Sequence, residues 1–96
     1  MANININITE VQKQARLLRE ASANLTKGTV KPLGESKDRL ASAWTGDSAK
    51  TFVKYTDDLI GQLQSNAKDI NEIAAFLENA CNTFRKADQQ AKSRIK

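Results

Sequence analysis

Few side chains in this sequence could do chemistry. The chain has no His, a single Cys (Cys81) and eleven Asp or Glu residues scattered over its 96 residues. A Ser or Cys nucleophile therefore lacks the imidazole that usually activates it, and one Cys without His leaves no zinc-ligand set. We expect a protein that is not an enzyme, with no catalytic residue, metal site or cofactor. Cys81 is either a small buried apolar residue or, in an exported protein, the site of a disulfide between chains.

The positive charge of the chain is concentrated at one end. The net charge is +4, and residues 85–96 account for all of it because they hold five Lys or Arg and one Asp. Such a tail could neutralise a few phosphates, but no aromatic side chain for base stacking lies among these charges. We expect a solvated helix end whose cations complement the helix dipole, and no nucleic-acid partner.

The sequence contains no recognisable membrane or leader segment. No apolar run approaches the roughly 18 residues of a transmembrane helix. The N-terminal stretch MANININITE lacks the basic and apolar regions of a cleaved signal peptide. We therefore expect no transmembrane segment, and a protein that stays in the cytoplasm or leaves it by a route without a cleaved leader.

The triplet Trp44-Thr45-Gly46 stands near the midpoint of the chain and holds its only Trp. Gly46 can adopt the backbone conformations that a tight reversal needs, and Asp47 or Ser48 can cap a following helix. We therefore expect a turn at residues 44–46, with the Trp44 side chain plugging the open end of a helix pair.

The second half of the chain predicts one long amphipathic helix over residues 47–93. Its apolar and small residues recur at intervals of three and four, with one extra step of four near Leu63. The stripe continues through Phe84, Ala91 and Ile95, with Asp88 where an apolar residue is expected. By pattern alone, Asp88 is a solvent-reaching residue near a frayed helix end.

The first half predicts a helix over residues 9–43, after an extended arm at residues 1–8. Thr9 and Gln12 form a capping box. The stripe of this helix is expected to consist of Val11, Ala15, Leu18, Ser22, Leu25 and Thr29, and to resume at Leu33, Ser36, Leu40 and Ala43.

The segment KGTVKPLGES interrupts this first helix. Gly28, Pro32 and Gly34 all disfavour helix, and a Pro in a helix interior costs about 3 kcal/mol. We expect the helix to be kinked or broken near residues 28–34, with its direction kept. Residues 94–96 form a short tail.

Helix length adds a prediction about assembly. A first helix that ends near residue 43 matches the second helix only as far as about Cys81, so the remainder overhangs the hairpin. Two hairpins packed antiparallel would cover both overhangs, and we expect an all-α dimeric four-helix bundle of 96-residue, single-domain chains. The expected hairpin and dimer seam consists of Leu18, Leu25, Leu40, Phe52, Leu59, Leu63, Ile70 and Leu77.

The length, the Trp44-Thr45-Gly46 turn, the two amphipathic arms and the spacing of Phe84, Asp88, Ala91 and Ile95 together resemble the WXG family of small helical hairpins, the early secretory antigenic target-like proteins. Members of this family are substrates of the type VII (ESX-type) secretion system of actinobacteria and firmicutes. The resemblance implies a helix-turn-helix that dimerises and leaves the bacterial cytoplasm folded, without a cleaved leader, for the medium or the cell surface. It also implies a two-part signal for the export ATPase, which joins the turn (Trp44, Gly46) to the C-terminal motif (Phe84, Asp88) of the partner subunit.

Two features depart from the family pattern. The usual motif is Tyr-xxx-Asp/Glu, and Phe84 lacks the hydroxyl of that Tyr; the interruption near Pro32 is the other departure. A Phe at this position also resembles related small helical proteins that pair with a larger toxin. Two functions therefore stay open: a secreted homodimer, or a heterodimeric targeting partner or chaperone for a larger toxin or a second small helical protein.

Overall fold

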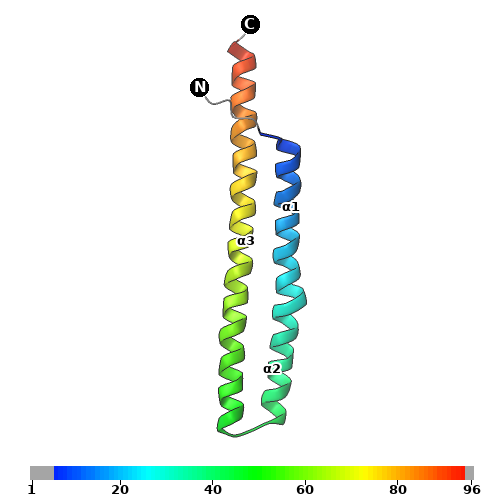
Figure 1. Ribbon diagram of the computed structural model, residues 1–96, viewed down its shortest axis with the longest axis vertical. Coiled ribbons are helices and arrows are strands. Elements are labelled where there is room, and N and C mark those ends of the chain that lie inside the picture. The colour runs from blue at the N-terminus through cyan, green and yellow to red at the C-terminus, as the bar shows by residue number, and fades with distance from the viewer. Residues whose placement is uncertain (1–5, 95–96) are drawn as a thin grey trace.

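The protein is an antiparallel hairpin of two helical arms, as the sequence predicts. The computed structural model describes residues 6–94 and the side chains of residues 6–91. The first arm consists of α1 (Ile8–Leu25), the π-helical segment η1 (Thr26–Val30) and α2 (Lys31–Ala43), and the second is α3 (Asp47–Arg94) (Figure 1). The molecule measures 76 × 22 × 16 Å. Its radius of gyration is 21.6 Å, whereas a compact domain of this size has about 13 Å.

The first arm begins two residues earlier than the capping box predicts. Asn7 is the N-cap, and its side-chain oxygen accepts a hydrogen bond of 3.1 Å from the backbone N–H of Glu10. Thr9 is already inside the helix. Asn is as good an N-cap as Thr, and Glu10 follows Asn7 at capping-box spacing, so the sequence carries both signals. Of the arm expected at residues 1–8, Ile6 and Asn7 precede the helix, Ile8 belongs to α1, and residues 1–5 lie outside the described residues.

The irregularity expected near residues 28–34 takes the form of the π-helical segment η1 and not of a break, because the chain stays helical from Ile8 to Ala43. In a regular α-helix the Pro32 ring would clash with the carbonyl group of Gly28 and leave it without a donor. The π-helical turn just before Pro32 relieves this conflict, since its hydrogen bonds run to the fifth preceding residue, as from Lys31 N–H to Thr26 O. The arm therefore continues in one direction (Figure 1).

Small side chains occupy the contact between the two arms. The buried residues of the described part are Ala15, Ser22, Val30, Ala49, Thr56, Ala67, Ala74 and Cys81, and we call this set the seam. Cys81 is the largest side chain that is completely buried. The two hydroxyl groups are satisfied: Ser22 Oγ donates to Ala67 O across the seam at 2.8 Å, and Thr56 Oγ1 donates to Phe52 O at 2.9 Å. Helices with such small contacts approach closely, so larger side chains must lie beside the seam.

The spacing of the seam corrects one prediction for the first arm. Val30 is buried, whereas Thr29, the expected stripe residue, is exposed. The π-helical turn adds one residue to the arm, so that Ser22 and Val30 are eight apart instead of seven. On α3, Thr56 and Ala67 are eleven apart, which is the extra step of four in the sequence pattern. Both irregular intervals lie between the Ser22–Ala67 contact and the turn.

Candidate functional site

The turn between the arms is built by its Trp and its Gly. Trp44 has an extended backbone and donates its N–H to Leu40 O at 2.9 Å, which ends α2. Gly46 has φ +111°, a conformation that a residue with a Cβ rarely adopts. Its carbonyl oxygen then accepts from Lys50 N–H at 3.1 Å as α3 begins. The reversal therefore depends on glycine at position 46.

The Trp44 side chain lies on Phe52 and does not plug the end of the helix pair. The two ring centroids are 6.0 Å apart, with the planes tilted by 48°. Both rings remain open to solvent, with 44% of Trp44 and 39% of Phe52 exposed. The turn thus presents a large, half-covered aromatic pair.

The C-terminal motif lies at the far end of the rod. Cys81 is fully buried and its Sγ lies 3.9 Å from Ile8 O, so α1 begins at the level of Cys81. Residues 82–94 extend past the first arm (Figure 1). Phe84 on this overhang is half-buried, whereas Asp88 and Ala91 are exposed; Ile95 lies outside the described residues. Within one chain the structure does not bring Trp44 and Gly46 near Phe84 and Asp88.

Large apolar side chains gather on one side of the seam. At about 100° per residue, positions three after or one before a seam residue lie roughly 60–100° to one side of it. On α3 these positions contain no charged residue, and eight of the ten are apolar; α1 adds Leu18, Ala21 and Leu25. We call this side the apolar face; on α3 it consists of Ser48, Phe52, Tyr55, Leu59, Asn66, Ile70, Ile73, Leu77, Ala80 and Phe84.

Much of the apolar face is not covered within the chain. Tyr55 is 72% exposed and Ile73 is 52% exposed, while Phe76, also 72% exposed, extends this side further round α3. Several residues expected in the hairpin and dimer seam lie on this side and not in the buried contact between the two arms. Leu40, Phe52 and Leu59 are exposed, and Leu18, Leu25, Leu63, Ile70 and Leu77 are half-buried.

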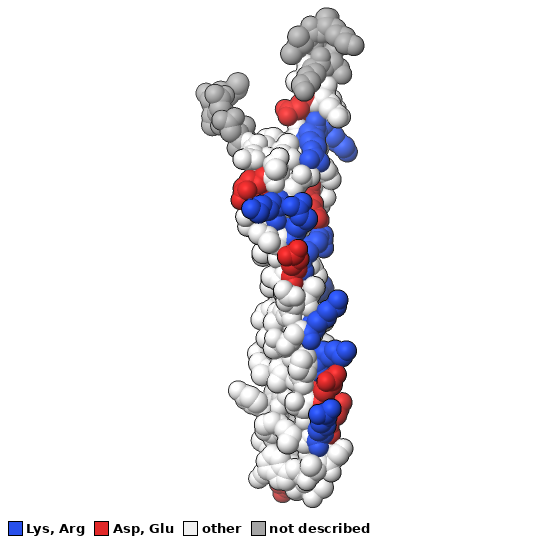
Figure 2. Space-filling model, turned by 90° about the vertical axis from the view of Figure 1, so that its right-hand side faces the viewer, with Lys and Arg blue, Asp and Glu red and all other residues white. Residues whose placement is uncertain are grey.

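Charged residues gather on the other side, at positions one or four after a seam residue. We call this side the charged face, because five of its ten positions on α3 are charged. The ten positions are Lys50, Val53, Asp57, Ile60, Lys68, Asn71, Ala75, Glu78, Asn82 and Arg85. In Figure 2 charged side chains follow one edge of the rod, and the opposite edge is nearly free of them over its lower part.

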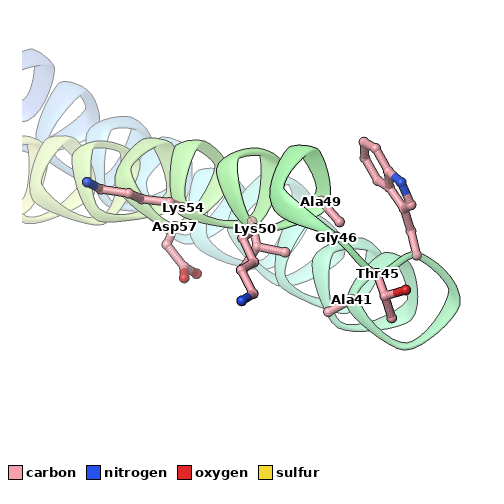
Figure 3. Close-up of a pocket in the computed structure, with 9 residues that line it drawn as sticks. Ala41, Thr45, Gly46, Ala49, Lys50, Lys54 and Asp57 are labelled. Atoms are coloured by element: carbon pink, nitrogen blue, oxygen red, sulfur yellow. The ribbon is translucent and has the colours of Figure 1, made fainter.

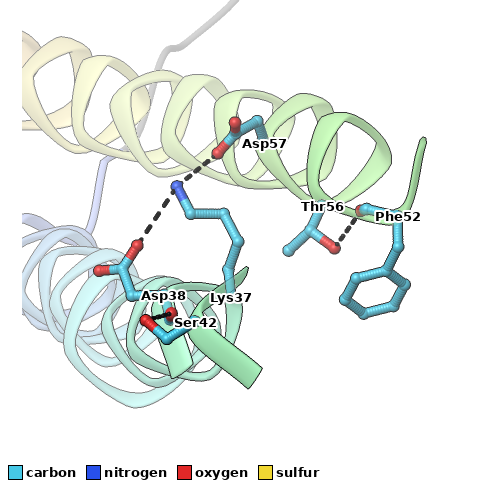
Figure 4. Close-up of polar contacts among 6 residues, drawn as sticks. All are labelled: Lys37, Asp38, Ser42, Phe52, Thr56 and Asp57. Atoms are coloured by element: carbon cyan, nitrogen blue, oxygen red, sulfur yellow. Dashed lines mark hydrogen bonds and ion pairs between the residues drawn. The ribbon is translucent and has the colours of Figure 1, made fainter. Parts of the chain in front are cut away.

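Two ion pairs join the arms on the charged face. Arg19 donates to both carboxylate oxygens of Glu78, at 2.6 and 3.0 Å, and this hydrogen bonding lowers the pKa of Glu78 and raises the pKa of Arg19. Lys37 donates to Asp57 at 2.6 Å and lies 3.9 Å from Asp38 (Figure 4). The hydrogen bond to Asp57 raises the pKa of Lys37. Both ion pairs are exposed to solvent, so each adds little to the stability of the hairpin. Their main effect is to favour this alignment of the two arms.

A groove of about 460 Å³ lies beside the turn. The turn residues 44–46 close one end, and Ala41, Ala49 and Val53 contribute apolar surface. Lys50, Lys54 and Asp57 line it from successive turns of α3 (Figure 3). Sequence reasoning missed this groove, because it forms only where α2 and α3 meet.

A comparison with protein families identifies the chain's relatives. The model of the family described as proteins of 100 residues with WXG (WXG100) matches residues 3–89. The chain belongs to the WXG100 family. No curated protein and no solved structure matches it. WXG100 proteins are small helical hairpins of type VII secretion that typically pair with helical partners and are not enzymes in general.

Two further findings bear on this WXG100 protein. None of its described helices is both long enough and apolar enough to cross a membrane. Within the described residues, no group of three or more His, Cys, Asp or Glu side chains is placed to hold a metal ion.

Proposed function

We propose that the protein is a substrate of a bacterial type VII secretion system, exported from the cytoplasm as a folded homodimer to the medium or the cell surface. The observation that carries this proposal is the uncovered apolar face, which runs from the Trp44–Phe52 pair to Phe84 along α3. Contiguous apolar surface of this kind on a soluble protein marks an interaction site. A second hairpin of the same kind offers a matching surface.

The overhang supports an antiparallel arrangement of the two hairpins. Residues 82–94 project about 20 Å beyond the first arm, at a rise of about 1.5 Å per residue. In an antiparallel dimer with two-fold symmetry, each overhang lies beside the turn of the other subunit. Phe84 of one chain then covers the aromatic pair at the turn of the other.

The same arrangement yields the composite signal. Trp44 and Gly46 lie at one end of the chain's rod and Phe84 and Asp88 at the other, so only a second chain can bring the two parts together. Asp88 is exposed, which leaves its carboxylate available to the export ATPase. Ala91 and, by sequence, Ile95 continue the apolar side of this motif. The ATPase would thereby recognise only chains that have folded and paired.

Export from the native bacterium tests this proposal. The amounts of protein in culture supernatant and cell lysate are compared for the wild type, Trp44→Ala, Asp88→Ala and a strain lacking the secretion ATPase. Loss of extracellular protein in all three, with unchanged intracellular level and solubility, supports the composite signal. Asp69→Ala is the matched control, because Asp69 is exposed on the outer side of the same helix. Undiminished export of Asp88→Ala contradicts the signal.

The alternative is a heterodimeric targeting partner or chaperone for a larger type VII toxin or a second small helical protein. It is favoured by the composition of the apolar face, in which the aromatic side chains come from the turn and α3, and α1 and α2 supply Leu and Ala. Light scattering on the purified chain separates the two functions. A stable dimer supports the homodimer, and a monomer supports a different partner.

A further inference from the structure

The groove beside the turn opens away from the apolar face. Lys50 and Asp57 follow seam residues by one position and Val53 follows Ala49 by four, so all three lie on the charged face. Figure 3 shows Lys50 and Asp57 projecting to the same side of α3. A second hairpin seated on the apolar face, as in the dimer proposed above, covers Trp44 at one end of the groove but leaves the side lined by Lys50, Val53 and Asp57 open.

The groove combines an apolar floor with a cationic rim. Its floor is formed by Ala41, Ala49 and Val53, and the carboxylate of Asp57 is already occupied by Lys37 at 2.6 Å. Among the described side chains, no carboxylate lies within 4.0 Å of the ammonium groups of Lys50 and Lys54. The charge available to a ligand is therefore positive. The volume lies within the range of about 300–1,000 Å³ that is typical of binding pockets.

We propose that this groove binds an acidic protein segment that inserts one large apolar side chain, supplied by a protein other than the second hairpin. The apolar side chain fills the floor and excludes water, and carboxylates one helical turn from it pair with Lys50 and Lys54. Anchors of this kind, buried in a small pocket beside complementary charges, carry much of the affinity of protein interfaces. The occupant is not the overhang of a second copy, because Phe84 lies on the apolar face and would seat on that face of the partner.

A displayed library of random short peptides, selected on the purified protein, tests the proposal. The expected result is enrichment of peptides that contain an aromatic or branched apolar residue close to Asp or Glu. In fluorescence anisotropy, the double variant Lys50→Gln/Lys54→Gln should bind an enriched peptide about tenfold more weakly, and added salt should weaken binding to the wild type. Lys13→Gln/Lys68→Gln is the control, because it removes the same charge elsewhere and should bind as the wild type does.

Three outcomes would overturn the proposal: no enrichment over an unrelated protein, enriched peptides without acidic residues, or equal binding by the two double variants. Val53→Thr adds a second probe, since it keeps the shape of the floor but makes it polar, and it should weaken the same peptide. Circular dichroism verifies that each variant is folded. The proposal depends on the proposed dimer in one respect: the dimer is the reason why the second hairpin does not occupy the groove. Light scattering tests the dimer separately, so the two can fail independently.

Discussion

The two sides of the hairpin seam differ although the same helices build both. None of the ten α3 residues of the apolar face is charged, whereas five of the ten α3 residues of the charged face are. Two carboxylates of the charged face find partners on the other arm, since Glu78 pairs with Arg19 and Asp57 pairs with Lys37. The apolar side chains opposite find no such cover, because the small seam keeps the arms close together and leaves Tyr55 and Ile73 outside.

This difference shows how stability is divided between the chain and its partner. Complete burial of a Leu, Ile or Phe side chain contributes about 1.5–3 kcal/mol, and most of that contribution is absent where the side chain stays in water. The hairpin buries mainly Ala, Ser, Thr and Cys. Association through the apolar face would supply the missing burial. On the charged face the large apolar side chains, Val53 and Ile60, are already half-buried, so association there would add less burial.

The sharpest test of the comparison places a charge on each face in turn. Ile73→Asp puts a carboxylate into the proposed interface, twice per symmetric dimer, and should raise the dimer dissociation constant at least about a hundredfold. Asn71→Asp places the same charge two residues away on the charged face and should leave the dimer unchanged. Sedimentation over a range of concentrations measures both. Equal dissociation of the two variants would contradict the assignment of the faces.

A larger side chain in the seam should destabilise the hairpin. Ala74 is completely buried, so Ala74→Leu forces the arms apart and should lower the free energy of unfolding by about 1–3 kcal/mol. Ala87→Leu is the control, because Ala87 is exposed on the overhang of the same helix. Urea denaturation of the two variants measures the difference. If Ala74→Leu were as stable as Ala87→Leu, the close contact of the arms would be refuted.

A smaller effect is expected for the hydrogen bond that crosses the seam. Ser22→Ala removes the donor to Ala67 O and should lower the free energy of unfolding by about 1 kcal/mol. Ser42→Ala is a suitable comparison, since the Ser42 hydroxyl bonds only to Asp38 O on its own helix and is exposed. Thermal unfolding followed by circular dichroism measures both. A larger loss for Ser42→Ala would argue against the seam contact.

The smallest expected effect is the loss of thermal stability at acid pH when the Arg19–Glu78 ion pair of the charged face is broken. Because Arg19 lowers the pKa of Glu78, the pair stabilises the fold above the pKa of an unfolded glutamate and is lost as the pH falls through the folded value. Glu78→Gln should therefore unfold at a slightly lower temperature near neutral pH and match the wild type in acid. Thermal unfolding over an acidic pH series measures this. An unchanged difference at all pH values would assign the effect to something other than the ion pair.

The main features of the fold could be predicted from spacing and chemistry. The intervals of three and four on both sides of Trp44-Thr45-Gly46 predicted the hairpin and its turn, and Gly46 has the backbone conformation that only glycine readily adopts. Helix lengths placed the start of the overhang near Cys81, which is level with Ile8 in the structure. These predictions succeeded because they depend on local geometry.

Other features could not be read from the same pattern. Apolar periodicity treats Phe52 and Ala49 alike, but only the packed arms show that the small residue enters the seam and the large one lies beside it. The burial of Val30 in place of Thr29 depends on the π-helical turn, which is a compromise between Pro32 and the contact with α3. The groove at the turn combines residues from both arms. Its lysines carry no distinctive sequence signal.

The sequence by itself determined the helical arms, the place of the reversal and the family, because hydrophobic period, glycine at a turn and a short motif act over a few neighbouring residues. The tertiary structure decided which side chains are buried, which face carries the ion pairs and where a groove opens. Those properties depend on the distance between two helices and on the residues that meet across it. Small seam residues set that distance, and the larger side chains were thereby left on the surface.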